Sequence, residues 1–194
     1  MLKFAIVGNI ASGKSTVENE LIEKGLKVFD TDKLSHVILE NSKNEVIQEF
    51  NGFDVLENGS ISRAKLGKIV FNDKNLKEKL ENIIYPKLKE KISEIFEENS
   101  SKKYVFISIP LLFEVGWQNL FDKILFVKTD DEIRLNRLMK RNSYTKEEAM
   151  ARISAQISQE EKIKKSDFII CNNGTLEMLQ NEIERFIIQL EEME

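Results

Sequence analysis

Short runs of β-branched, leucine and aromatic residues alternate along the chain with longer segments in which apolar residues recur at helical spacing. This alternation is typical of βαβ units, which build a parallel sheet. The predicted strands are residues 2–7, 26–29, 104–109, 123–127 and 168–171. The first, third and fourth of these are almost wholly apolar, as expected of strands that are covered on both faces. The pattern predicts an α/β fold around a five-stranded parallel sheet.

Two long segments of mostly helical, polar pattern interrupt the alternation. Residues 32–101 far exceed what one crossover helix needs, so we expect an insertion with its own task. Within it, Ser62 is expected to cap a helix, and Pro86 is expected to interrupt one because proline lacks the backbone N–H. Residues 130–165, rich in Arg, Lys and Glu, predict a solvated helical flap, or lid. We therefore expect one domain with its core in residues 1–31, 102–129 and 166–194.

Residues 175–194 predict an amphipathic helix at the end of the chain. Its apolar positions recur at helical spacing and are expected to cover one face of the sheet. They are Leu176, Leu179, Ile183, Phe186, Ile187 and Leu190.

A phosphate-binding motif follows the first predicted strand. Residues 8–15 are "GNIASGKS", a full match to G-x-x-x-x-G-K-[ST], and a helical pattern begins near Lys14. Backbone N–H groups and the positive end of that helix can surround the phosphates of ATP, Lys14 supplies a charge, and Ser15 can ligate Mg²⁺. The alternative is a chance match that binds nothing. The expected nucleotide-binding residues are Gly8, Ala11, Ser12, Gly13, Lys14, Ser15 and Thr16.

Asp32 is the candidate general base. It follows the second predicted strand, and the carboxyl ends of parallel strands face one crevice where ligands bind. A carboxylate there can orient a hydroxyl group and accept its proton as the hydroxyl attacks a phosphoryl group. Asp32 can equally be the cap of a helix that starts at Lys33, whereas Asp30 is the weaker candidate for the base.

Three arginines of the lid are spaced to share one helix face. Arg134, Arg137 and Arg141 fall at positions i, i+3 and i+7, with their guanidinium groups expected to be free to close over phosphates. Arg152 and Gln156 lie on the next helical segment and are candidates for the same site. The alternative is a solvated face of surface ion pairs.

The overall charge excludes several classes of partner. Twenty-nine Lys and Arg against 33 Asp and Glu give a net charge of -4, so no global positive field attracts nucleic acid or an anionic membrane. The single cysteine and single histidine leave neither an intramolecular disulfide nor a zinc cluster. The apolar run at the N-terminus is too short for a signal peptide. We expect a cytoplasmic protein.

Eight segments together resemble the dephospho-coenzyme A kinase family, and the likeness covers roughly residues 4–174. Of these, "IPLLFE", "AMARISAQ" and the terminal "NNG" are more specific than the phosphate loop. In chain order the matching segments are "GNIASGKST", "FDTDKLSHVI", "NGSISRAKLGKIVF", "LENIIYPKL", "IPLLFE", "RLNRLMKR", "AMARISAQ" and "SDFIICNNG".

The resemblance implies a P-loop NTPase-type three-layer sandwich and transfer of the ATP γ-phosphoryl group to the ribose 3′-hydroxyl of dephospho-coenzyme A. It implies Asp32 as the base, Arg137 and Arg141 as lid residues, and Asn172 beside the adenine. The insertion would bind the acceptor. Residues implied or considered for acceptor binding are Asp32, His36, Arg63, Tyr85, Pro110, Leu111 and Phe113.

The chain departs from the family pattern at five positions. Val7 stands where Thr is frequent, Asn9 and Ala11 replace glycines, Tyr85 replaces His, and Ser108 occupies a place often held by Asp. Since Ala tolerates positive φ poorly, we expect Ala11 to adopt a φ below zero. Because Ser carries no charge, Mg²⁺ would depend more on Ser15, phosphate oxygens and water.

Two other classes of function remain open on the sequence. The phosphate loop and lid arginines also suit another small-molecule or nucleoside monophosphate kinase. A non-catalytic nucleotide switch is the second alternative, although the guanine-reading motif Asn-Lys-x-Asp is absent from the sequence. Oligomeric state cannot be inferred from the sequence.

Overall fold

The structure, a computed structural model, describes residues 1–193. The chain folds as two compact units. The sheet unit comprises Met1–Phe29 and the chain from Ser100 onward, and the helical unit comprises Asp30–Asn99. The segment predicted as a lid belongs to the sheet unit. No helix within residues 1–193 is both long and apolar enough to cross a membrane.

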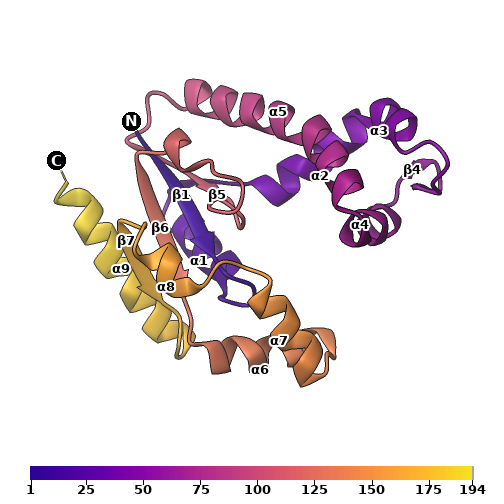
Figure 1. The fold of residues 1–194 in the computed structure, drawn as a ribbon. Coiled ribbons are helices and arrows are strands. Elements are labelled where there is room, and N and C mark those ends of the chain that lie inside the picture. The colour runs from indigo at the N-terminus through magenta and orange to yellow at the C-terminus, as the bar shows by residue number, and fades with distance from the viewer. Residues whose placement is uncertain (194) are drawn as a thin grey trace. The chain divides into compact units, whose positions relative to one another are not determined.

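The predicted five-stranded parallel sheet is confirmed (Figure 1). Its strand order is β2-β5-β1-β6-β7, so β1 is central and pairs in parallel with both β5 and β6. Strand limits agree with the predictions to within one residue at each end. The strands are β1 (Leu2–Gly8), β2 (Lys27–Asp30), β5 (Tyr104–Ser108), β6 (Lys123–Lys128) and β7 (Phe168–Cys171).

Two helices cover one face of this sheet. Helix α1 (Lys14–Glu23) contributes Val17 and Leu21, and α9 (Leu176–Glu191) packs beside it and against β7 (Figure 1). The Phe4 and Phe106 rings stack at 4.8 Å and both meet Phe186 edge-on. Of the six predicted apolar positions of α9, Leu179, Ile183, Phe186 and Leu190 are buried and Ile187 packs against them. Leu176 is 54% exposed, because it lies in the first turn, beyond the edge of this core.

The remaining helices of the sheet unit follow β5 and β6. A short 3₁₀ turn, η1 (Gln118–Leu120), precedes β6. After β6 come α6 (Asp131–Asn142), α7 (Lys146–Ser154) and α8 (Gln159–Ile163). Helix α7 begins with a reciprocal capping box between Thr145 and Glu148, which fixes its start. These three helices make up the segment predicted as a lid.

The helical unit surrounds a small core of its own, formed by Val46, Phe50, Val55, Ile61 and Leu66. The turn at Asn58 and Gly59 has positive φ at both residues and joins a two-stranded hairpin. The elements of this unit are α2 (Thr31–Asn41), α3 (Lys43–Glu49), β3 (Leu56–Glu57), β4 (Ser60–Ile61), α4 (Arg63–Asn72) and α5 (Lys74–Glu98).

Two sequence predictions for this unit need correction. Helix α5 continues through Pro86 instead of ending there. Proline removes one backbone hydrogen bond, but Ile84 and Leu88 on either side are buried, so tertiary packing stabilises the turn that contains it. Ser62 does stand at the N-cap position of α4, yet its hydroxyl donates to Glu57 Oε2 at 2.9 Å instead of capping the helix.

Candidate active site

The phosphate loop joins the carboxyl end of β1 to the start of α1, as the motif requires. The loop closes through a hydrogen bond from the Ser12 N–H to the Asn9 carbonyl at 3.0 Å. The Thr16 N–H donates to the Gly13 carbonyl, also at 3.0 Å, and starts the helix. Alternating left-handed residues in such a loop turn successive N–H groups toward a common centre, which is an anion-binding arrangement.

The expectation that Ala11 has a negative φ is wrong. Its φ is 63°, and Gly13 follows at 81°. The left-handed conformation costs alanine roughly 1–2 kcal/mol. Closure of the loop through Ser12 and Asn9 fixes the backbone at residue 11, so the geometry of the turn outweighs the preference of the side chain.

Gly8 and Gly13 are needed because side chains crowd them. A Cβ at Gly13 would collide with the Asn172 amide nitrogen, and a Cβ at Gly8 would collide with Ser12 Oγ. The Asn172 Nδ2 donates instead to the Ser12 carbonyl at 2.8 Å, so this side chain holds the loop from the end of β7. Its predicted proximity to adenine stays a prediction.

Lys14 lies in a buried polar group of three side chains. Its ammonium is 2.6 Å from Glu18 Oε1, one helical turn further along α1, and it also donates to the Ser108 hydroxyl. Ser108, at the end of β5, donates to the same Glu18 oxygen at 2.6 Å. Glu18 was not among the predicted site residues, although its i+4 spacing from the motif lysine was a signal.

Buried donors face the loop on the side of β6, β7 and α6. Thr129 Oγ1 donates to the Ser12 carbonyl at 2.8 Å, and Arg137 Nη2 donates to the Asn172 carbonyl at 3.1 Å. Ser12 Oγ and Arg137 Nη1 are buried and have no hydrogen-bond partner among the described residues. Unsatisfied buried polar atoms are costly, so this pair is suited to receive the oxygens of an anion.

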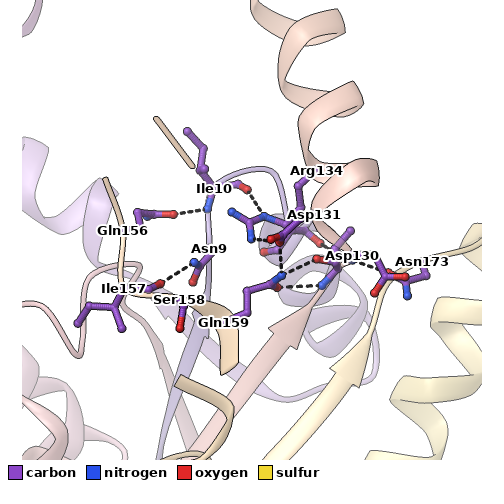
Figure 2. Close-up of polar contacts among 12 residues, drawn as sticks. Asn9, Ile10, Asp130, Asp131, Arg134, Gln156, Ile157, Ser158, Gln159 and Asn173 are labelled. Atoms are coloured by element: carbon purple, nitrogen blue, oxygen red, sulfur yellow. Dashed lines mark hydrogen bonds and ion pairs between the residues drawn. The ribbon is translucent and has the colours of Figure 1, made fainter. Parts of the chain in front are cut away.

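The segment after β6 is hydrogen bonded to both backbone groups of one loop residue, Ile10 (Figure 2). Gln156 Oε1 accepts from the Ile10 N–H at 2.7 Å, while Arg134 Nε donates to the Ile10 carbonyl at 3.0 Å. The neighbouring Asn9 side chain donates to the Ile157 carbonyl at 2.9 Å. These contacts anchor the first half of the phosphate loop to the segment predicted as a lid.

The prediction that all three lid arginines present free guanidinium groups is wrong for Arg134. It is 1% exposed, pairs with Asp131 at 2.8 Å and holds Ile10, and its burial lowers the pKa of its guanidinium group. Arg137 is half-buried beside Asn172, and Arg141 is exposed and donates to Asn142. The guanidinium of Arg152 stacks over the Tyr144 ring at 4.6 Å. Arg134, Arg137 and Arg141, on one face of α6, therefore have three different surroundings.

Four predicted acceptor residues line one cavity within the helical unit. Asp32, His36, Arg63 and Tyr85 surround a space of about 280 Å³. Apolar side chains from α2, α4 and α5 complete its wall, and they are Leu39, Val70, Leu80 and Ile84. A small apolar cavity with a few convergent polar groups is the usual form of a small-molecule site.

Within this cavity, Asp32 is not the helix cap. Helix α2 begins at Thr31, before the predicted Lys33, and Asp30 is its N-cap, accepting a hydrogen bond from the Asp32 N–H at 2.8 Å. Tyr85 Oη donates to Glu81 Oε1 at 2.8 Å. Burial and the Glu81 carboxylate raise the pKa of the Tyr85 phenol above its usual range.

The other predicted acceptor residues belong to the sheet unit. Leu111 is 42% exposed, whereas Phe113 and the nearby Trp117 are core side chains, 7% and 5% exposed. Pro110 is partly exposed. Glu114, in the same segment, pairs with the buried Lys162 of α8 at 2.7 Å and so links this segment to the lid helices.

The side chains near the phosphate loop supply few ligands for a metal ion by themselves. Within residues 1–193, no group of three or more His, Cys, Asp or Glu side chains is placed to hold one. The exposed Ser15 hydroxyl in the first turn of α1 and the nearby Glu18 carboxylate are oxygen donors of the kind that Mg²⁺ takes. The donor set fits Mg²⁺ if phosphate oxygens and water complete it.

Known proteins share both this sequence and this fold. The sequence profile of the dephospho-CoA kinase family matches residues 2–178. A dephospho-CoA kinase of Fusobacterium nucleatum is 44% identical over 183 residues, 93% of this chain and 94% of that protein. One from Listeria monocytogenes is 42% identical over 187 residues, 94% of each chain.

Solved structures agree with these sequence relatives. The dephospho-CoA kinase of Campylobacter jejuni superposes with a TM-score of 0.75 and 35% identity, covering 97% of this chain and 96% of that one. The shikimate kinase of Aquifex aeolicus, covering 98% and 96%, reaches 0.52 at 13% identity, which shows a shared fold only. With its phosphate loop and these relatives, the chain belongs to the dephospho-CoA kinase family.

Proposed function

We propose that this chain transfers the γ-phosphoryl group of ATP to the ribose 3′-hydroxyl of dephospho-coenzyme A, giving coenzyme A and ADP. The observation that carries the proposal is the phosphate loop with buried donors beside it, in a chain of this family. Phosphoryl transfer depends on positioning and on stabilising charge, which are the properties that such a loop supplies.

The loop and its neighbours receive the nucleotide. The N–H groups of residues 11–15 and the N-terminal end of α1 bind the phosphates, and Lys14 and Thr16 flank them. Ser12 Oγ and Arg137 Nη1, buried without partners among the described residues, have the chemistry to donate to phosphate oxygens. Arg137 and Arg141 stabilise the charge that develops on the transferred group, and Asn172 lies beside the adenine.

Mg²⁺ is the metal that accompanies the triphosphate in this proposal. Ser15 would hold it, and when bound it neutralises phosphate charge. The chain's own residues do the remaining work, because Lys14 and the loop N–H groups fix the phosphates in one orientation.

Asp32 acts as the general base. It stands two residues beyond β2, which shares the sheet with β1, and carboxyl ends of parallel strands border one crevice. Its carboxylate orients the acceptor hydroxyl and takes its proton during attack. His36, Arg63, Tyr85, Pro110, Leu111 and Phe113 form the proposed acceptor-binding set.

We further propose that the protein works in the cytoplasm on small molecules, without a nucleic acid or membrane partner. The net charge of -4 and a single cysteine, Cys171, support this placement.

An acceptor panel tests the proposal against other kinases. Purified protein is mixed with MgATP and either dephospho-coenzyme A, AMP, GMP or shikimate, and ADP release is measured. We expect rapid release with dephospho-coenzyme A and far less with the other three. Equal or faster release with any of those would reject the assignment, and nucleotide binding without ADP release would favour a non-catalytic switch.

A further inference from the structure

Glu18 is a buried carboxylate beside the phosphate loop that the proposed reaction has not yet used. It is 7% exposed, and its Oε1 accepts from Ser108 at 2.6 Å and contacts the Lys14 ammonium at 2.6 Å. A buried carboxylate is costly unless it is well paired. Glu18 has both partners, and one of them is the lysine of the phosphate loop, so its carboxylate lies at the phosphate end of the site.

The neighbouring strand end lacks a charge that P-loop enzymes commonly have there. In many of them an Asp following a strand of the sheet helps the loop Ser or Thr to hold the metal. Here one of the two strands beside β1 is β5, whose last residue, Ser108, pairs in register with Ile6. Its hydroxyl is neutral, but it is hydrogen bonded to a carboxylate that arrives from α1.

Spacing on α1 brings that carboxylate to the side of the helix that carries Ser15, whose hydroxyl is the proposed Mg²⁺ ligand. Glu18 follows Ser15 by three residues and Lys14 by four, and both spacings place side chains on one helix face. Ser108 fixes the carboxylate from the sheet side. A carboxylate carried by the helix is thus hydrogen bonded to the residue at the strand end, Ser108.

We propose that Glu18, held by Ser108, is the positioning carboxylate of the magnesium site. It supports the water shell of the Mg²⁺ that Ser15 ligates and pairs with Lys14 in the absence of nucleotide. The proposal rests on the proposed function, since it needs a magnesium-bound nucleotide at this loop. Mg²⁺ keeps several waters in protein sites, so a carboxylate that binds those waters is a suitable partner.

Calorimetric titration of the full chain with ADP, once with Mg²⁺ and once with a chelator, measures this role without turnover. The quantity is the ratio of the two affinities. In the Glu18→Gln variant we expect the magnesium-dependent gain to fall roughly tenfold or more, since outer-shell partners contribute about 10–100-fold to metal affinity. The affinity without metal should be unchanged or higher, because Lys14 loses a competing partner.

Two further variants separate this role from simple packing. Glu20→Gln is the matched control, since Glu20 is also buried on α1 but accepts from Gln180 and not from the phosphate-loop lysine. It should keep the wild-type ratio. The double variant Glu18→Gln, Ser108→Asp again has a carboxylate at this place, now carried by the strand. It should recover much of the increase in ADP affinity that Mg²⁺ causes in the wild type.

Three results would overturn the inference. They are an unchanged ratio in Glu18→Gln, an equal loss of affinity with and without Mg²⁺, and no gain from Mg²⁺ in the wild type. A crystal structure of the wild-type complex with MgADP tests it independently of variant folding. Glu18 bonded to a metal-bound water supports it, and Glu18 remote from the metal contradicts it. Failure of the wild type to bind ADP at all would instead reject the proposed function.

Discussion

At the scale of single residues, the chemistry of phosphate binding sets the residue types of the loop, and tertiary packing decides which groups surround them. Lys14 and Ser15 follow from the motif alone, because the chemistry of phosphate binding dictates residue types at fixed spacing. Arg134 has the same spacing as Arg137, yet it is buried against the Ile10 carbonyl. Helical periodicity defines a face, but it does not say what covers that face.

The role of Asp32 gives the first residue-scale prediction. In Asp32→Asn the side chain keeps its size but loses the basic oxygen, so we expect kcat to fall by about 10²–10⁴-fold with little change in the affinity for either substrate. Steady-state kinetics and equilibrium binding measure the two quantities. Asp30→Asn is the matched control, since Asn also caps helices and should leave kcat near the wild-type value. Full turnover by Asp32→Asn would exclude the base role.

The strained backbone at Ala11 gives the second residue-scale prediction. Glycine has no Cβ to oppose a φ of 63°, so Ala11→Gly should raise the free energy of unfolding by up to about 1 kcal/mol. Ala151→Gly, in the exposed interior of α7, should lower it by about 1 kcal/mol because its backbone is helical. Denaturant unfolding compares the two. A loss of similar size at both positions would mean that residue 11 has a negative φ.

At the scale of elements, the sheet was predicted more accurately than the helices between its strands. Strands covered on both faces are almost wholly apolar and end at polar residues, so their limits are visible in the sequence. The prediction that a helix ends at Pro86 was wrong because the lost backbone hydrogen bond is a local cost. The packing of the buried Ile84 and Leu88 stabilises α5 on both sides of the proline. The prediction that Leu176 covers the sheet was wrong because the helical periodicity extends beyond the part of α9 that packs on the core.

The attachment of the phosphate loop to the lid segment gives an element-scale prediction. Gln156→Ala leaves the partly buried Ile10 N–H without its acceptor, and such a loss costs about 1–3 kcal/mol. Since the loop is then free to change shape, we expect ATP to bind roughly tenfold more weakly. Gln180→Ala, at a comparable site on α9, removes a hydrogen bond to Glu20 and should leave ATP affinity unchanged. Equal affinity in Gln156→Ala and wild type would exclude a role for this contact.

At the scale of the whole molecule, some features follow from local sequence patterns, whereas others depend on contacts between distant parts of the chain. The limits of the strands, the loop motif and the insertion are each encoded within short stretches of sequence. The groups that surround Lys14 come from positions as far apart as Glu18 and Ser108, and the loop is held by Thr129, Gln156 and Asn172. Such clusters depend on which strands become neighbours, so a single sequence does not reveal them.

The identity of the product tests the central claim most directly. Purified protein is incubated with MgATP and dephospho-coenzyme A, and the products are followed by phosphorus NMR and mass spectrometry. The account predicts one new phosphomonoester on the ribose 3′-oxygen, formed in step with ADP. Absence of that ester, or a phosphoryl group on any other oxygen, would contradict it.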